Sequence, residues 1–93
     1  MHEASLMRDL MRRIDTVAES AGGGRVVRVE VWLGALSHMS ESHFREHFEH
    51  ASAGTRAEGA ELAVTASDAL DHPDAQGILL GSIDVADGPD GSG

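Results

Sequence analysis

The chain has 93 residues, no cysteine and a formal charge of −9, which comes from 16 acidic residues and 7 arginines without any lysine. This length predicts one small domain, the acidic balance argues against nucleic acid as a partner, and the missing thiols exclude disulfides, thiolate metal sites and cysteine nucleophiles. No apolar run approaches the roughly 18 residues of a membrane span and no basic-then-apolar leader precedes the first helix, so we expect a cytoplasmic protein that does not interact with a membrane.

The first predicted element is an amphipathic helix in SLMRDLMRRIDTVAESAGGG. We expect Ser5 to be its N-cap and the glycines at 22–24 to stop it. Its apolar residues recur at helical spacing and predict the buried stripe Leu6, Leu10, Ile14 and Val17.

The segment RVVRVEVWLGAL alternates with period two, which predicts a strand with one buried face. The buried face should carry Val27, Val29, Val31 and Leu33, and the other face Arg28, Glu30 and Trp32. A second helix is expected in ESHFREHFEHASAG, capped by Ser40, ended near Gly54 and buried along Phe44, Phe48 and Ala51. AELAVTA, with Leu62 and Val64 on one face, and GILLGSIDVA read as two further strands.

This order of elements predicts an α+β fold, a two-layer α/β sandwich with two helices packed on one face of a small three-stranded mixed sheet. The intervening helix favours a parallel pairing of the first two strands, and the short loop SDALDHPDAQ favours an antiparallel pairing of the last two. We expect one domain over residues 1–86 and a loose tail over 87–93.

No catalytic pattern is apparent, so an enzyme is not expected. AGGGR lacks the spacing of a phosphate-binding loop, and nothing resembles a nucleophile elbow.

The histidines are candidate metal ligands. His43, His47 and His50 share one face of the second helix, which suits either a divalent-metal chelator or, as Glu46 and Glu49 nearby favour, an ordinary solvated face. His38 is interpreted as a loop or packing residue. His72 lies among three aspartates in the loop before the last strand, but that loop lacks the spacing of a calcium-binding EF-hand; the aspartates are Asp68, Asp71 and Asp74.

The start MHE offers different chemistry, because its backbone can take part. The terminal amine, the deprotonated amide of His2 and its imidazole can close fused five- and six-membered chelate rings around one ion. Three nitrogens in a plane suit Ni(II) or Cu(II), whereas Zn(II) prefers a tetrahedron. On chemistry alone, a chance MHE start is the competing explanation.

The sequence resembles the nickel domain of the HypA/HybF-type nickel metallochaperones of hydrogenase maturation. The resemblance rests on MHE at the start, the turn LGALSHMS, the helix with Phe48, the run GTRAEGAEL and the closing strand GILLGSIDVA. It implies that Met1, His2 and Glu3 form the nickel site. It also implies delivery of Ni(II) to the precursor of the [NiFe]-hydrogenase large subunit, or to urease, together with an accessory GTPase.

One departure from this family is large. The family inserts a zinc-binding domain with two CxxC pairs between the last two strands, and here the loop 67–77 replaces it. No zinc is therefore expected, and the fourth nickel ligand should be water, Glu3 or His72, the only imidazole of that loop. A metal-free interaction module derived from the same fold, or a small regulatory α/β domain, are the alternatives. Arg8 and Arg12 form a basic helix face that either docks the GTPase or is merely solvated.

Overall fold

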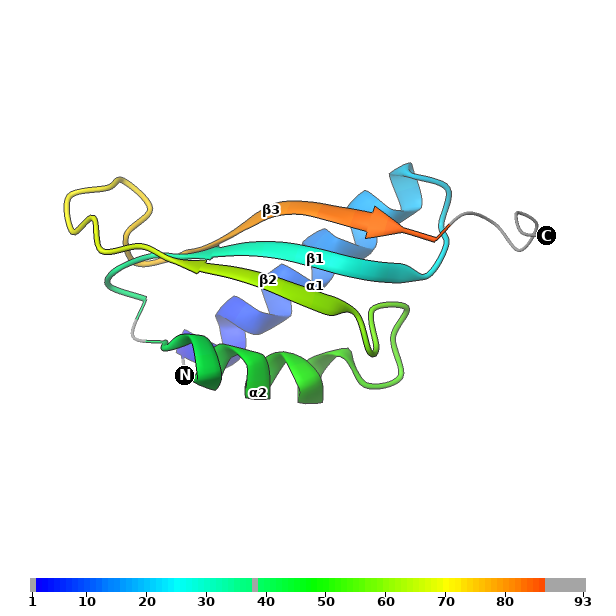
Figure 1. The fold of residues 1–93 in the computed structure, drawn as a ribbon, viewed down its shortest axis with the longest axis horizontal. Helices are drawn as coiled ribbons and strands as arrows, with labels where there is room; N and C mark the ends of the chain where they lie inside the picture. The colour runs from blue at the N-terminus through cyan, green and yellow to red at the C-terminus, as the bar shows by residue number, and fades with distance from the viewer. Residues whose placement is uncertain (1, 38, 87–93) are drawn as a thin grey trace.

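The computed structural model describes residues 2–37 and 39–86, with side chains from residue 5 onward. His38 and the predicted tail 87–93 lie outside this range. All five predicted elements are present in the predicted order (Figure 1); they are α1 (His2–Ser20), β1 (Val26–Leu33), α2 (Glu41–Ser52), β2 (Glu61–Ala66) and β3 (Ile78–Val85).

The sheet has the order β2-β1-β3, with β1 in the centre. β1 pairs with β2 in parallel, as predicted, and with β3 in antiparallel fashion, so the sheet is mixed. The expected pairing between the last two strands is wrong, because β3 crosses to the free edge of β1. This arrangement covers β1, whose inward side chains are the most deeply buried of the sheet, on both edges.

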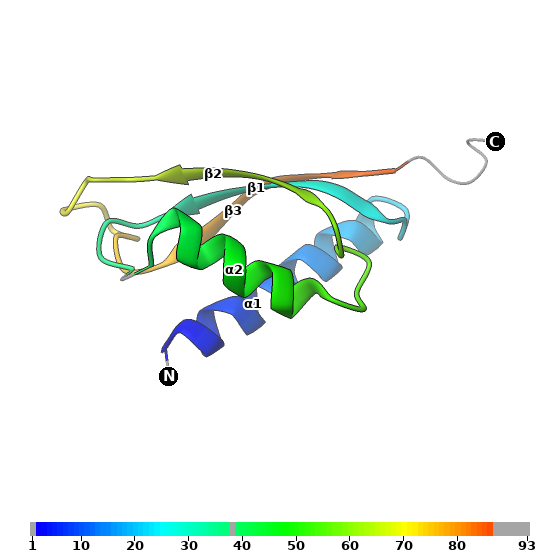
Figure 2. The same ribbon diagram turned by 60° about the horizontal axis from the view of Figure 1, so that its bottom comes forward.

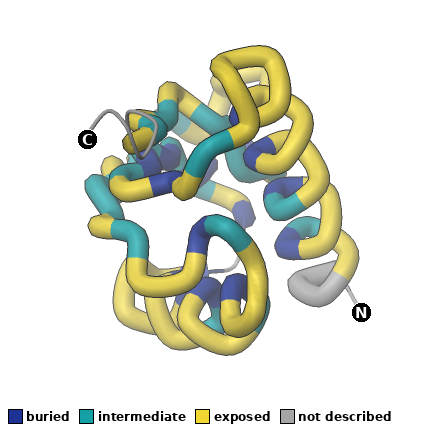
Figure 3. Tube along the Cα trace, turned by 90° about the vertical axis from the view of Figure 1, so that its right-hand side faces the viewer, coloured by how far each residue is buried: buried dark blue, intermediate teal, exposed yellow. Residues whose placement is uncertain are grey.

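Both helices lie on the same face of the sheet, which confirms the two-layer α+β fold (Figure 2). The buried residues gather between the helices and the sheet (Figure 3). Phe44 and Phe48 contribute the largest buried side chains of α2 and are accompanied by Ser52, while Ala51 is only half-buried. The two phenylalanine rings lie 6.1 Å apart, which is an ordinary spacing for packed aromatic rings.

Three details of α1 differ from the sequence prediction. The helix begins at His2, so Ser5 lies inside it and is not its N-cap. Leu6 is only half-buried, and Met7 takes its place in the core. Val17 is 41% exposed whereas Ala18 is fully buried, so the buried stripe is displaced by one residue at both ends. The stripe is Met7, Leu10, Ile14 and Ala18. Its last member is small, which lets this end of α1 approach the sheet closely.

The start of β1 also departs from strict alternation. Val26 is fully buried and Val27 is 43% exposed, the reverse of the predicted faces. A register shift between Val26 and Arg28 in the pairing with β3 explains this, because an additional residue in one strand turns the following side chains to the other face. From Val29 onward the predicted alternation is correct.

Side chains of β1 on the other face of the sheet are polar or amphipathic. Glu30 accepts hydrogen bonds from Nη1 of Arg28 and Oγ of Ser82, each at 3.0 Å. The hydrogen bond from Arg28, followed by that from Ser82, lowers the pKa of the Glu30 carboxyl. This polar network is consistent with a face that no described helix covers (Figure 2).

The N-terminus of α2 follows the prediction closely. Ser40 is the N-cap, with its Oγ accepting a hydrogen bond from the amide of His43 at 3.2 Å. The helix ends at Ser52, and Gly54 adopts a left-handed φ of +80° just beyond the cap, a conformation that glycine accepts without strain.

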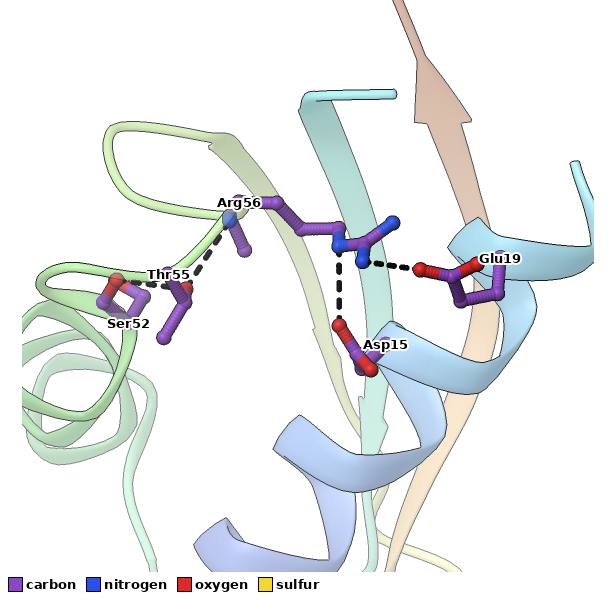
Figure 4. A network of polar contacts seen from close by, with 6 residues as sticks. Asp15, Glu19, Ser52, Thr55 and Arg56 are labelled. Atoms are coloured by element: carbon purple, nitrogen blue, oxygen red, sulfur yellow. Dashed lines mark hydrogen bonds and ion pairs between the residues drawn. The ribbon is translucent and has the colours of Figure 1, made fainter. Parts of the chain in front are cut away.

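Arg56 fastens the connection between α2 and β2 to α1 (Figure 4). Its guanidinium forms ion pairs with Asp15 and Glu19, one turn apart on α1, and its carbonyl accepts a hydrogen bond from the amide of Val26 at 2.9 Å. The hydrogen bond to Glu19, followed by the charges of Asp15 and Glu19, raises the pKa of Arg56. One residue thereby joins α1, β1 and the chain that leads into β2.

The loop 67–77, between β2 and β3, is attached to the turn after β1. The amide of Gly34 donates to the carbonyl of Gly77 at 2.9 Å, and that of Leu36 donates to the carbonyl of Ala75 at 2.7 Å. The two backbones approach so closely that a Cβ atom on Gly34 would overlap the carbonyl of Ala75 and lie 2.7 Å from the Asp74 oxygen. Only glycine fits at residue 34.

We therefore expect Gly34→Ala to lower the free energy of unfolding by about 1–3 kcal/mol, the usual range for an overpacked site. Urea denaturation measures the loss. Gly77→Ala is the matched control in the same loop, because a Cβ there would lie 3.7 Å from its nearest neighbour. Equal stability of the two variants would contradict the close packing of the loop on the turn.

Candidate metal site

The predicted chelating residues lie at the start of α1. The backbones of His2 and Glu3 form the first residues of the helix, while Met1 and the side chains of both residues are outside the described part of the chain. The first four amides of an α-helix have no acceptor within the helix, so a metal that takes the nitrogen of His2 would break no helical hydrogen bond. The helix dipole disfavours a cation here by about 0.3–1 kcal/mol but favours the deprotonated amide.

Three segments come together at this end of the molecule. α1 and α2 both begin here, and the turn that follows β1 leads into α2 (Figures 1 and 2). Met7 from the start of α1 and Met39 from the turn are both buried in the common core. Ser37 in the same turn is 5% exposed, and its hydroxyl has no hydrogen-bond partner within the described residues. The start of α1 is therefore packed against the turn after β1 through Met7 and Met39.

His72 lies at the same end of the molecule but in the layer of the sheet. Its ring packs on Trp32, with the ring centroids 4.7 Å apart, and its Nδ1 accepts a hydrogen bond from the amide of Asp74 at 2.9 Å. Trp32 lies between the buried Val31 and Leu33, so its side chain faces away from the helices. Because Nδ1 is the acceptor, a neutral His72 ring carries its proton on Nε2, and Nε2 could bind a metal only after losing that proton. The ring would also have to leave Trp32 to reach the start of α1.

The histidines of α2 are only partly brought together. His43 and His47 lie with their Nε2 atoms 3.0 Å apart and their ring centroids 4.6 Å apart. His50 lines a groove near the end of α2 with Phe48 and Leu62. Within residues 5–37 and 39–86, no three or more histidine, aspartate or glutamate side chains form a group that could hold a metal ion. The described side chains thus contain no complete metal cage.

The basic residues of α1 have few acidic partners. Arg12 pairs with Asp9 at 3.4 Å, while Asp15 binds Arg56 on the other side of the helix. Arg8 and Arg13 form no ion pair with any carboxylate whose side chain is described. Arg8 and Arg13 therefore remain as positive charges without a described acidic partner on an otherwise acidic protein.

A groove beside these arginines could not be found from the sequence. It lies between α1 and β3 and is lined by Asp9, Arg12, Arg13, Thr16, Val17 and Leu80. Its apolar residues include the exposed Val17, which the helical periodicity had assigned to the core. The groove exists only because β3 lies beside α1, whereas the sequence predicted that β3 would pair with β2.

Comparison with known proteins shows which family the chain belongs to. Residues 1–70 match the family described as "Hydrogenase/urease nickel incorporation, metallochaperone, hypA". A metallochaperone is a metal carrier rather than a catalyst. The match covers most of the chain and includes the MHE start, and the chain belongs to the HypA family.

Individual relatives agree with this assignment. The hydrogenase maturation factor HypA of Thermomicrobium roseum is 39% identical over 98 aligned positions, which cover 100% of this chain and 72% of the relative. HypA of Chlorobium limicola is 39% identical over 64 residues, or 69% of this chain and 55% of the relative. HybF of Salmonella typhimurium is 41% identical over 64 residues, or 69% of this chain and 57% of the relative.

The chain spans little more than half the length of the Chlorobium and Salmonella relatives. The family match ends at residue 70, inside the loop 67–77 where the sequence predicted that the zinc-binding insert is missing. The absence of cysteine is consistent with that loss. A search of the described helices finds none long and apolar enough to cross a membrane.

Proposed function

We propose that this protein is a cytoplasmic nickel metallochaperone that captures Ni(II) at its N-terminus and delivers it during maturation of [NiFe]-hydrogenase, or of urease. The observation that carries the proposal is the MHE start within a region, residues 1–70, that matches the nickel-incorporation family. A helix that begins at His2 supports it, because such a start offers a free backbone nitrogen beside an imidazole.

In the proposed capture step, the amine of Met1, the amide of His2 and its imidazole Nδ1 occupy three corners of a square around Ni(II). Amine, amide and imidazole must be deprotonated to bind, so binding releases protons and weakens as the pH falls. Hand-over to a partner then proceeds by exchange of ligands, one at a time, and a drop in pH assists it.

The fourth corner of the square is assigned to water, to Glu3 or to His72. His72 lies at the correct end of the molecule, but its ring packs on Trp32 on the far face of the sheet and accepts a hydrogen bond at Nδ1. Engagement of His72 would replace the contact with Trp32 by a bond to the metal. In the neutral ring it would also require the Nε2 proton to leave, with a proton taken up at Nδ1 and loss of the Asp74 hydrogen bond, because a protonated nitrogen has no lone pair for the metal.

The proposed partners are an accessory GTPase and the precursor of the hydrogenase large subunit. Arg8 and Arg12 lie on successive turns of α1, on the helix whose start carries the proposed nickel ligands. An acidic patch on the GTPase would complement this charge and bring the metal end into contact with its acceptor.

A metal-free interaction module is the second candidate. The short length relative to the Chlorobium relative and the absence of thiolates favour it, since part of the family's metal-binding apparatus is missing. Binding of nickel by the chain with its native terminus distinguishes the two candidates.

The first prediction concerns the terminus. Calorimetry with Ni(II) on protein whose Met1 is confirmed by mass spectrometry should give one dominant site per chain, diamagnetic because it is square-planar. His2→Ala, or acetylation of the terminal amine, should abolish this site because either change removes a corner of the square. His50→Ala is the control with the same loss of one imidazole. Unchanged affinity after the amine is blocked would reject the N-terminal chelate.

The second prediction concerns His72. Trp32 is the only tryptophan of the chain, so its fluorescence reports on the ring that covers it. If His72 fills the fourth corner, nickel should change this fluorescence at one equivalent, and His72→Ala should alter both the visible d–d spectrum and the nickel affinity. If the spectrum and affinity of His72→Ala match those of the parent, the fourth ligand is water or Glu3.

The third prediction concerns docking. Arg8→Ala, Arg12→Ala should weaken binding to the accessory GTPase, most strongly at low ionic strength, because surface charges are screened over about 10 Å at 0.1 M salt. Arg25→Ala, Arg45→Ala removes the same charge elsewhere and is the matched control. Equal binding by the two double variants at every salt concentration would rule out a role of the α1 arginines.

A further inference from the structure

The strand β3 leaves one edge of the sheet open. It pairs with β1 on one side, and no described strand lies on its other side (Figure 1). Among the described residues, no side chain forms a hydrogen bond with the β3 backbone, whereas in the other edge strand the carbonyl of Leu62 accepts one from Arg45 at 3.3 Å. The free backbone groups of an edge strand form a template for pairing with another strand.

The composition of β3 lacks the usual protection of an edge strand. Natural edge strands are commonly blocked by proline, by lysine or by charged side chains that point into the core. β3 (Ile78–Val85) has no proline and no basic residue. Its one charge, Asp84, lies opposite Arg28 on the face of the sheet that no described helix covers. The strand therefore offers about 26 Å of open backbone without a side chain that prevents pairing.

A bulge at Gly81 makes the two halves of β3 symmetric. In the pairing with β1, Leu80 lies opposite Val31 and Ser82 lies opposite Glu30, so Gly81 is an additional residue in the strand. The side chains that face the helices are Ile78, Leu80, Ile83 and Val85, and those that face away are Leu79, Ser82 and Asp84. The order of faces is therefore the same when the strand is followed from either end.

This pattern fits a second copy of the same strand. In an antiparallel pair, residues directly opposite each other project from the same face of the sheet. When two β3 strands meet at their midpoints, Ile78 lies opposite Val85 on the helix side. Leu80 lies opposite Ile83 on that side, and the residues of the other face likewise meet each other. A strictly alternating strand of this length could not do so, because its first and last residues would face opposite ways.

The groove between α1 and β3 lies beside the same edge. A two-fold axis perpendicular to the sheet, through the middle of the new strand pair, keeps the helices of both copies on one face. It brings the two α1 helices side by side, because α1 is the helix that packs next to β3. Val17, which lines the groove and is 41% exposed, then gains an apolar neighbour.

We propose that the free edge of β3 is a dimer interface, at which a second copy of this chain pairs in antiparallel fashion and extends the sheet to six strands. The two ends at which α1 begins lie far apart in this dimer, because antiparallel strands start at opposite ends. The net charge of −9 on each copy opposes association, so the dimer dissociates on dilution. The interface does not depend on the proposed nickel function.

Sedimentation equilibrium of the metal-free full chain measures the dissociation constant of the dimer. Leu79 lies opposite Asp84 of the second copy, twice per dimer. Leu79→Glu places like charges there and should raise the dissociation constant about 5–30-fold, whereas Leu79→Lys places opposite charges there and should not raise it. Leu79→Glu, Asp84→Asn removes the repulsion and should recover most of the loss.

Thr65→Glu and Thr65→Lys are the matched controls. They change the net charge by the same amounts at an exposed position of β2, the far edge strand, so their dissociation constants should differ much less than those of the two Leu79 variants. Circular dichroism confirms that each variant is folded.

Spin labels locate the interface, because the chain has no cysteine and a single label can be placed at will. Labels on Ser82→Cys should show strong dipolar broadening, since the two positions lie on adjacent strands. Labels on Thr65→Cys should be separated by at least about 24 Å, which is five strand spacings. A monomer at every concentration up to about 1 mM, equal dissociation constants of the two Leu79 variants, or stronger coupling at residue 65 than at residue 82 would overturn the proposal.

Discussion

The central strand β1 is the constraint on which the rest of the structure depends. Val29, Val31 and Leu33 are almost completely buried, and both helices pack over the surface that they form. Covering this strand on both edges requires β2 on one side and β3 on the other, which is why β3 does not form a hairpin with β2. The hydrophobic effect stabilises the strand order β2-β1-β3, because a β2–β3 pair would leave β1, the most apolar strand, at an exposed edge.

The same strand organises the metal end of the molecule. Where β1 ends, Gly34 allows the loop 67–77 to pack directly on the backbone, and the following turn carries Met39 into the core and Ser40 to the cap of α2. The loop 67–77 is held there by backbone hydrogen bonds to the turn and by the packing of the His72 ring on Trp32. No metal–thiolate bond can contribute, since the chain has no cysteine.

The carrier function proposed above depends on nitrogen ligands. The start of α1 offers backbone amides that no carbonyl of the helix accepts. Nitrogen ligands compete with protons, whereas the acidic surface of the protein attracts divalent cations without holding them.

The sequence alone determined the elements, their order, the two-layer fold and the α2 cap, because periodicity and capping are local properties of the chain. The MHE chemistry was also visible there, since neighbours in sequence can chelate without tertiary structure. Only the tertiary structure decided the partner of β3, the exposure of Val17 and Val27, and the contact of His72 with Trp32. Each of these depends on how distant segments pack: a register shift turned the start of β1 over, and the small Ala18 replaced Val17 where α1 meets the sheet. The spacing of His43 and His47 came from sequence, but the 3.0 Å between their nitrogens required the folded helix and its rotamers.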